Sequence, residues 1–289
     1  MCRFGAKGKN MSVLKTFVPR KDFLLCVDSD GSVMDTMEIK HKRCFGPCMV
    51  DEWNLSNWQK PILKRWNDIN LYTMTRGINR FRGLALALGE IHKKYTFIEG
   101  VDELNAWVGT AQELSNQAVE AEYNRTGLAI FRKALNWSEA ANRAIAALPQ
   151  DDKQPFVCAF EGLSVARSFA DVAVISSANR DAVEKEWKLC GLRDYADIML
   201  CQDTGSKARC IAELLKKGYA PKHVLMVGDA PVDKMAAERN GVFYYPILAR
   251  YENDSWEELI SEAIPRLREG IYAPYGERKT RQFLDNLNI

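Results

Sequence analysis

Three aspartates follow directly on a short apolar run in the first part of the chain. The run is FLLCV, residues 23–27, and the aspartates are Asp28, Asp30 and Asp35. Because clustered carboxylates repel one another and are costly to remove from water, an ordinary loop rarely carries three of them. The pattern indicates that a positive charge belongs beside them.

Two further apolar runs, at 172–175 and 223–227, have the same character as the first. Short continuous runs of this kind fit strands of a parallel sheet that is covered on both faces. Helical patterns at 181–190, with Asn179 as its N-cap, and at 207–217 alternate with the runs. We therefore predict a Rossmann-like three-layer α/β core with a parallel sheet.

Polar residues follow each of these runs. They are Asp28, Asp30, Ser176, Asp229 and Asp233, together with Lys207 at the start of the helix before the last run. In open parallel sheets, ligands bind at the carboxyl ends of the strands, so we expect these side chains to meet there. Four carboxylates, a hydroxyl and an ammonium form an oxygen-rich set that suits Mg²⁺ and phosphate.

These motifs resemble the haloacid dehalogenase superfamily of phosphoryl-transfer enzymes in four places, in the family's order. The four are DSDGSVMD at 28–35, Ser176, Lys207 and GDAPVD at 228–233, and the family usually has threonine in place of Ser32. The resemblance implies a HAD-like core and phosphoryl transfer through an aspartyl-phosphate. Haloacid dehalogenases themselves lack an aspartate at the position of Asp30, so its presence favours phosphatases and phosphomutases.

The resemblance also assigns roles to individual residues. It makes Asp28 the nucleophile and Asp30 the general acid and base. It makes Ser176 and Lys207 the groups that hold the phosphoryl oxygens. The metal ligands it implies are Asp28, Asp30 through its carbonyl, Asp229 and Asp233, and the further substrate contacts are Gly31, Ser177 and Asn179. Asp35 is left out of catalysis, because it lies at the start of the next helix.

The stretch from about 36 to 169 contains no clear strand run. It reads as several helices, at 59–74, 79–95, 101–122 and 126–147. We predict a helical cap domain inserted after the first strand, which is where the family inserts one. The predicted domains are a discontinuous core at 18–35 and 166–250, a cap at 36–165 and a C-terminal helical extension at 251–289.

Within the predicted cap, TRGINRFRGLALAL at 75–88 resembles the substrate-specificity segment of caps of the β-phosphoglucomutase and phosphoglycolate phosphatase type. The resemblance makes Arg80, and less directly Arg76, a contact for a phosphate or another anionic group, which suits an arginine fork. The alternative is an ordinary amphipathic helix with Arg80 on its solvated face. The predicted cap is longer than is usual for this type.

Bulk properties exclude some classes of protein. The 289 residues are 47% hydrophobic and carry a net charge of +2, so we expect no nucleic-acid partner. No apolar stretch reaches the roughly 18 residues of a membrane span, and no secretory signal is recognisable, which predicts a cytoplasmic protein.

The eight cysteines are expected to be reduced thiols. His41, Cys44 and Cys48 are expected to pack and not to bind zinc.

We therefore predict a Mg²⁺-dependent phosphohydrolase that acts on a small phosphorylated metabolite. Three alternatives remain open at this point. One is a phosphomutase with the same residues, and another is a phosphonate hydrolase with a Schiff-base lysine at Lys60 or Lys64. The third is a non-catalytic binding protein. The sequence decides neither the substrate nor the oligomeric state.

Overall fold

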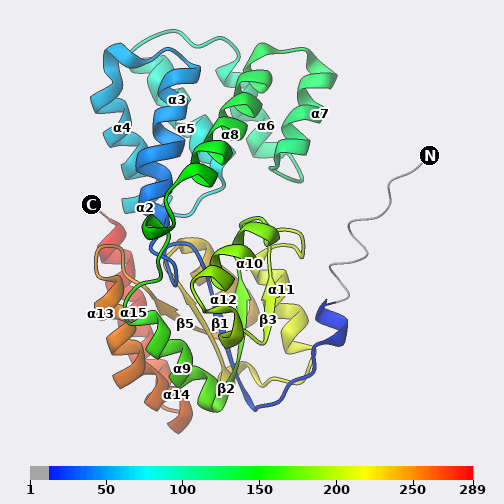
Figure 1. Ribbon diagram of the computed structural model, residues 1–289, viewed down its shortest axis with the longest axis vertical. Coiled ribbons are helices and arrows are strands. Elements are labelled where there is room, and N and C mark those ends of the chain that lie inside the picture. The colour runs from blue at the N-terminus through cyan, green and yellow to red at the C-terminus, as the bar shows by residue number, and fades with distance from the viewer. Residues whose placement is uncertain (1–12, 289) are drawn as a thin grey trace, which may run out of the picture. The chain divides into compact units, whose positions relative to one another are not determined.

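The structure is a computed structural model that describes residues 13–288 (Figure 1). The chain forms two compact units. One, here called the α/β unit, consists of the residues up to Thr36 and those from Lys153 onward, and the other, the helical unit, is Met37–Asp152.

A five-stranded parallel sheet forms the centre of the α/β unit, with the strand order β3-β2-β1-β4-β5. The strands are β1 Phe23–Val27, β2 Ala170–Ile175, β3 Ile198–Leu200, β4 Val224–Gly228 and β5 Phe243–Pro246. The three predicted strands are confirmed, and the two edge strands were not predicted. The central strand β1 pairs with β2 on one side and with β4 on the other, where Val27 lies opposite Val227.

Eight helical segments follow β1 in the described part of this unit. They are α9 Ala159–Phe169, α10 Arg180–Leu189, α11 Lys207–Leu215, α12 Pro231–Asn240, α13 Glu252–Glu258, a π-helical turn Leu259–Ala263, α14 Ile264–Glu269 and α15 Tyr272–Leu287, with short 3₁₀ turns at Arg193–Tyr195 and Pro221–His223.

The helices cover both faces of the sheet, which confirms the predicted three layers (Figure 1). Leu25 and Val27 of β1 belong to one core, with α9, α10, α13 and α14, while Leu24 and Cys26 belong to the other, with α11 and α12. Helix α15 contacts the edge strand β5 and contributes to both cores. Because successive side chains of a strand point to opposite faces, a continuous apolar run is what this burial requires.

The helical unit contains no strand among its residues, as the sequence analysis predicts. Its segments are α2 Met37–Ile39, a π-helical turn Lys40–Phe45, α3 Gly46–Glu52, a 3₁₀ turn Ser56–Trp58, α4 Gln59–Asn67, a π-helical turn Asp68–Tyr72, α5 Arg80–Lys94, α6 Val101–Thr110, α7 Asn116–Thr126, α8 Ala129–Ala147 and a 3₁₀ turn Gln150–Asp152. It has a core of its own, which includes the fully buried Trp66, Trp137, Phe81 and Phe131.

Two boundaries differ from those expected from the sequence. The helical unit ends at Asp152 and not at residue 165, because α9 packs its apolar side on the sheet through Ala159, Leu163 and Ala166. Residues from 251 onward are not a separate extension, because Trp256 and its neighbours belong to the core of the α/β unit. The helix expected at 101–122 is two helices, because Ser115 caps α7 by accepting a hydrogen bond from the Ala118 N–H.

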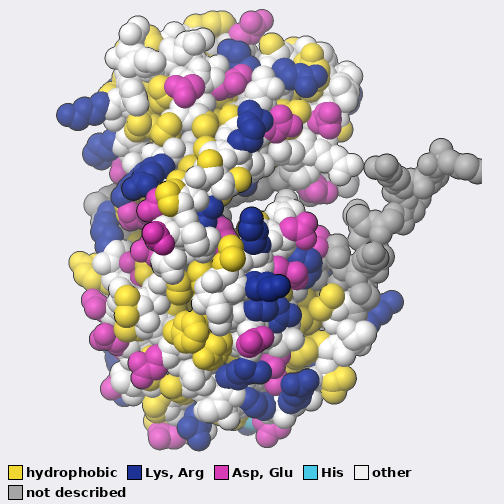
Figure 2. All heavy atoms as spheres, in the orientation of Figure 1, with side chains coloured by type: hydrophobic (Ala, Val, Ile, Leu, Met, Phe, Trp, Pro, Cys, Tyr) yellow, Lys and Arg dark blue, Asp and Glu magenta, His cyan; other side chains and the backbone are white. Residues whose placement is uncertain are grey.

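No helix in the described part of the chain is long and apolar enough to cross a membrane. The visible face of each unit carries basic and acidic side chains interspersed with apolar ones (Figure 2).

Candidate active site

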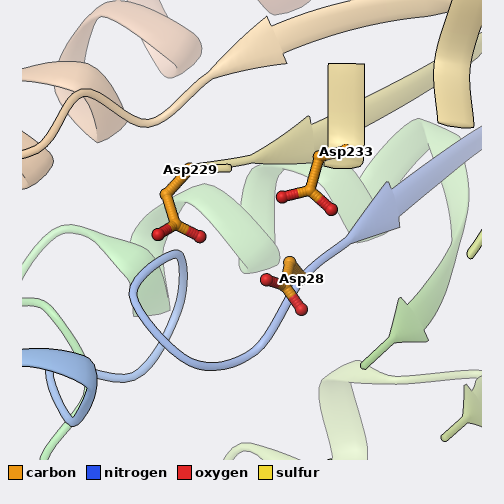
Figure 3. Close-up of side chains that lie close together, drawn as sticks. All are labelled: Asp28, Asp229 and Asp233. Atoms are coloured by element: carbon orange, nitrogen blue, oxygen red, sulfur yellow. The ribbon is translucent and has the colours of Figure 1, made fainter. Parts of the chain in front are cut away.

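Three carboxylates meet at the carboxyl ends of the two central strands. Asp28 follows β1, Asp229 follows β4, and Asp233 lies in the first turn of α12. One carboxylate oxygen from each residue lies within 4.8 Å of the other two, and all three residues are buried. Figure 3 shows the three side chains converging from these elements. The structure therefore brings together Asp28, Asp229 and Asp233 of the predicted metal ligands.

Local backbone geometry explains how the carboxylates come so close. The Asp28 N–H donates to the Val227 carbonyl oxygen across 3.0 Å, which places the end of β1 beside the end of β4. A Cβ atom at Gly228 would lie 2.4 Å from the Asp233 carboxyl carbon, so only glycine leaves room for that side chain. The Asp233 carboxylate also accepts a hydrogen bond from the Ala230 N–H at 3.1 Å.

Lys207 is the first residue of α11 and its ammonium group bridges two of the carboxylates. Its Nζ lies 2.8 Å from an oxygen of Asp28 and 2.5 Å from an oxygen of Asp233, and the side chain is 5% exposed. Burial alone lowers the pKa of Lys207, but the attraction of Asp233 and Asp28 outweighs it and raises the pKa above the ordinary value. The ammonium therefore stays charged at all physiological pH values.

The cluster nevertheless keeps an excess of negative charge, with three carboxylates around one ammonium. Burial, together with repulsion by Asp233 and Asp229, raises the pKa of Asp28 well above its ordinary value, although Lys207 counteracts the shift. Burial and the repulsion by Asp229 likewise raise the pKa of Asp233, against the same counteraction. A divalent cation would remove this excess, so the oxygen donors present here fit Mg²⁺.

Asp30 lies in the loop that follows Asp28, outside the three-carboxylate group. The Thr36 hydroxyl donates a hydrogen bond of 2.5 Å to its Oδ1. Gly31 has a φ of 81°, in the left-handed region that favours glycine, and this lets the loop turn sharply after Asp30. The Ser32 hydroxyl donates to Asp229 Oδ1 at 2.7 Å, a contact that the sequence analysis missed.

The residues after β2 have different surroundings. Ser176 is buried, its N–H donates to the Leu200 carbonyl at 2.9 Å, and its hydroxyl oxygen accepts from the Ala178 N–H at 3.1 Å. Ser177 is exposed. Asn179 is the N-cap of α10, as predicted, because its side-chain oxygen accepts from the N–H groups of Asp181 and Ala182. That oxygen is therefore already engaged within the helix cap.

Arg80 and Arg76 lie in the helical unit, whereas the carboxylates lie in the α/β unit. Arg80 is half-buried, and its Nη1 donates to Ser138 Oγ at 3.1 Å and to Asn142 Oδ1 at 2.7 Å. Its guanidinium also lies 4.8 Å from the centre of the Phe45 ring. Arg76 is buried and donates to the Leu71 carbonyl at 2.7 Å. Arg80 is thus partly exposed, and its guanidinium contacts other residues of the helical unit.

The group that the sequence analysis discounted as a zinc site packs in the helical unit. The His41 ring lies 5.0 Å from Phe45 and 5.7 Å from Trp66, and Cys44 is buried. Across residues 13–288, the one cluster with the ligand spacing for a metal is Asp28, Asp229 and Asp233. Seven cysteines are free thiols, and the eighth, Cys2, lies outside the described residues.

Two tryptophans that the sequence analysis did not connect with the site contact the loop after Asp28. The Trp187 indole N–H donates to Ser29 Oγ at 2.9 Å, and the Trp256 indole N–H donates to the Ser32 carbonyl oxygen at 2.7 Å. Trp256 lies 224 positions from Ser32, and no local pattern in the sequence links the two.

Comparison with known proteins gives a family. The model of the haloacid dehalogenase-like hydrolase family matches residues 102–246, half of the chain. The matched segment includes Ser176, Lys207, Asp229 and Asp233, and the geometry described above adds Asp28 from outside it. No curated protein matches the sequence.

Several solved structures match this chain at low identity. A haloacid dehalogenase-like family hydrolase from Xanthomonas campestris has 15% identity and a TM-score of 0.48, over 91% of this chain and 96% of that one. A haloacid dehalogenase-like family protein from Streptococcus pneumoniae has 12% identity and a TM-score of 0.48, over 81% and 90%. A predicted phosphoglycolate phosphatase from Haemophilus somnus has 15% identity and a TM-score of 0.43, over 78% and 86%.

At such identities the family assignment rests on the match to the family model and on the parallel α/β core that carries the matched motifs. The chain therefore belongs to the haloacid dehalogenase-like hydrolases.

Proposed function

We propose that this hydrolase is a Mg²⁺-dependent phosphohydrolase that acts on a small phosphorylated metabolite through an aspartyl-phosphate at Asp28. The observation that carries the proposal is the buried cluster of three carboxylates with Lys207 bridging two of them. A site that offers oxygen ligands and a fixed ammonium group suits a phosphoryl group, whose charge is spread over its oxygens in the transition state.

In the proposed mechanism, a carboxylate oxygen of Asp28 attacks phosphorus while the bond from phosphorus to the leaving oxygen breaks. Asp30 gives its proton to the leaving oxygen and then takes a proton from the water that attacks the aspartyl-phosphate. That second attack breaks the bond from phosphorus to Asp28 and releases inorganic phosphate. The Thr36 hydroxyl, 2.5 Å from Asp30, holds this carboxyl group in its loop throughout.

Lys207 and Ser176 would hold the phosphoryl oxygens, and Lys207 counteracts the upward shift of the Asp28 pKa that burial and the two neighbouring carboxylates cause. Asp28, the Asp30 carbonyl, Asp229 and Asp233 would hold Mg²⁺, which supplies positive charge to the phosphoryl oxygens when it is bound. Gly31 and Ser177 are proposed to contact the substrate. For the location we propose the cytoplasm, supported by the seven free thiols among the described cysteines.

The first experiment measures phosphate release from a panel of phosphorylated sugars, small acids, nucleotides and an aryl phosphate, with Mg²⁺ and with a chelator. We expect release that requires Mg²⁺ and is concentrated on one chemical class. Metal-dependent turnover that needs a bisphosphate and releases no phosphate would replace the proposal with a phosphomutase. Loss of activity after borohydride treatment with a phosphonate substrate would replace it with a phosphonate hydrolase.

Arg80 is proposed to recognise an anionic group of the substrate, since Ser138, Asn142 and Phe45 fix its guanidinium within the helical unit. Arg80→Ala is expected to lower kcat/KM for the best substrate of the panel by about 10- to 100-fold, the scale of a lost hydrogen bond to a charged group. Turnover of a small aryl phosphate should change much less. Arg65→Ala, which removes a surface pair with Glu90 in the same unit, is the control. Equal losses on both substrates would contradict a specificity role.

A further inference from the structure

The loop from Asp28 to Met34 carries both proposed catalytic carboxyls, and its own hydrogen bonds account for only part of its shape. The Ser29 carbonyl accepts from the N–H groups of Val33 and Met34, at 2.9 and 2.8 Å. These bonds close the loop on itself. Backbone bonds hold its two ends, since the Asp28 N–H donates to the Val227 carbonyl at 3.0 Å and the Val33 carbonyl accepts from the Phe156 N–H at 2.9 Å. Between these ends, buried side chains connect the loop to the surrounding elements.

One tie begins in the C-terminal segment. Trp256, in α13, is fully buried, and its indole N–H donates to the Ser32 carbonyl at 2.7 Å. The hydroxyl of the same serine donates to Asp229 Oδ1 at 2.7 Å. Ser32 is itself fully buried, so no water replaces either partner. A continuous chain of two hydrogen bonds therefore leads from Trp256 to a proposed metal ligand.

The indole is itself held in place from two sides. A Cβ atom at Gly162, in α9, would lie 2.3 Å from Cε3 of Trp256, so the ring lies directly against the backbone of that helix. The neighbouring Ser255 fixes α13 to the end of β5, since its carbonyl accepts from the Tyr245 hydroxyl at 2.7 Å and its hydroxyl oxygen accepts from the Leu248 N–H at 3.0 Å. The donor thus has little freedom to move.

A second indole contacts the other part of the loop. Trp187, in α10, is also fully buried, and its N–H donates to Ser29 Oγ at 2.9 Å. Ser29 lies between the two proposed catalytic aspartates, Asp28 and Asp30, in the sequence. Trp187 therefore binds the residue between the two proposed catalytic aspartates, and Trp256 binds a residue that contacts the proposed metal ligand Asp229. Neither bond is needed to complete a helix or a strand.

We propose that Trp256 is a positioning residue of the active site, which fixes Ser32 so that its hydroxyl holds Asp229 in place, with Trp187 holding Ser29 in the same loop. The C-terminal segment 252–287 is then part of the catalytic apparatus and not only a support for the sheet. This inference rests on the proposed function for its catalytic consequence. It acts through Ser32 and Asp229, because Trp256 itself is separated from the reacting atoms by both.

The test removes the indole N–H and leaves an aromatic ring. Trp256→Phe is expected to lower kcat/KM on a small aryl phosphate by about 10- to 100-fold, the range for outer contacts of metal ligands, and to raise the Mg²⁺ concentration for half-maximal activity. Amide hydrogen exchange in the peptide that spans 28–36 should become faster. The matched control is Trp137→Phe, because Trp137 is equally buried and donates to the Phe45 carbonyl at 2.9 Å in the helical unit. It should lose comparable thermal stability and keep its activity on the aryl phosphate.

A double-mutant cycle separates positioning from packing. If Trp256 acts through Ser32, then Ser32→Ala costs much less activity in the Trp256→Phe protein than in the unmodified protein. Additive losses, or a Trp256→Phe protein as active as the Trp137→Phe control, would overturn the inference. Should Trp256→Phe fail to fold, 3-benzothienylalanine at position 256 keeps a bicyclic ring of the same shape without the N–H donor.

Two readouts without turnover keep this inference distinct from the proposed function. Calorimetric titration measures the affinity for Mg²⁺ alone, and hydrogen exchange measures the protection of amides 28–36. Both can be compared between the unmodified and the Trp256→Phe protein even if neither hydrolyses any compound in the panel. An inactive but Mg²⁺-binding protein would refute the phosphohydrolase. Unchanged Mg²⁺ affinity and unchanged exchange in Trp256→Phe would refute the positioning role.

Discussion

Asp28→Asn is expected to lower kcat by on the order of 10⁴- to 10⁶-fold, the scale on which single catalytic nucleophiles act. Asparagine has nearly the shape of aspartate but is a poor nucleophile, so the aspartyl-phosphate no longer forms. The fold should persist, because the change removes one of three buried carboxylates and its repulsion with Asp229 and Asp233, while Lys207 keeps its contact with Asp233. We expect the thermal midpoint of the metal-free protein to stay the same or to rise.

The measurement is steady-state phosphate release at saturating Mg²⁺, together with a thermal unfolding scan. Asp35→Asn is the matched control, since Asp35 follows in the same segment, is exposed, and has no proposed catalytic role. It should retain nearly full activity. Substantial turnover by the Asp28→Asn protein would rule out a covalent intermediate on this residue and leave the carboxylate cluster as a metal site only.

Lys207→Met is expected to affect both catalysis and stability. The substitution removes the ammonium that lies between Asp28 and Asp233 and leaves buried carboxylates without their partner. Breaking a buried ion pair in this way costs about 3–5 kcal/mol of the free energy of unfolding, measured by urea denaturation of the metal-free protein at neutral pH. Activity should also be lost, because Lys207 is proposed to hold the phosphoryl oxygens.

The pH dependence of this loss has a definite sign. The pKa values of Asp28 and Asp233 are already raised in the folded protein by burial and by their neighbours, and removing Lys207 raises them further. A group whose pKa is higher in the folded than in the unfolded state contributes stability at low pH that is lost as the pH rises. The deficit of Lys207→Met should therefore be largest near neutral pH and shrink as the pH falls toward about 4, the ordinary range of an aspartate pKa.

Lys234→Met is the control for Lys207→Met, since Lys234 follows Asp233 directly and pairs with Glu238 near the surface of the same helix. Its effect on stability should be small at every pH. A pH-independent deficit in the Lys207→Met protein would show that lost packing, and not the uncompensated carboxylates, destabilises it. Mg²⁺ should restore part of the lost stability, because it supplies positive charge to the same oxygens.

The sequence predicts the central part of the sheet and misses its edges for a physical reason. The strands β1, β2 and β4 are buried and are apolar along most of their length, with Asp171 near the start of β2 as an exception. The edge strand β3 has only three residues, and β5 ends in Pro246. Such segments become strands because they pair with a neighbouring strand, and the local sequence does not predict this pairing.

The site shows the same division. Asp28, Lys207, Asp229 and Asp233 were predictable because each stands at the end of a strand or the start of a helix, and parallel topology brings such positions to one edge. The contacts of Trp187 and Trp256 were not predictable, because they depend on how α10 and α13 pack against the loop. Trp187 is visible in the sequence only as a core position of its helix.

The position of β1 at the centre of the sheet also sets the order in which the protein can be assembled. Leu24 pairs with Asp171 on one side and with Val224 on the other. The strand that is synthesised first therefore pairs with residues that follow it by about 150 and 200 positions. The helical unit between them has its own core and is complete before either partner leaves the ribosome. Contacts of such long sequence separation form slowly. A nascent chain therefore carries a folded helical unit well before it has an active site, and its exposed first strand depends in that interval on solubility conferred by its neighbours or by chaperones.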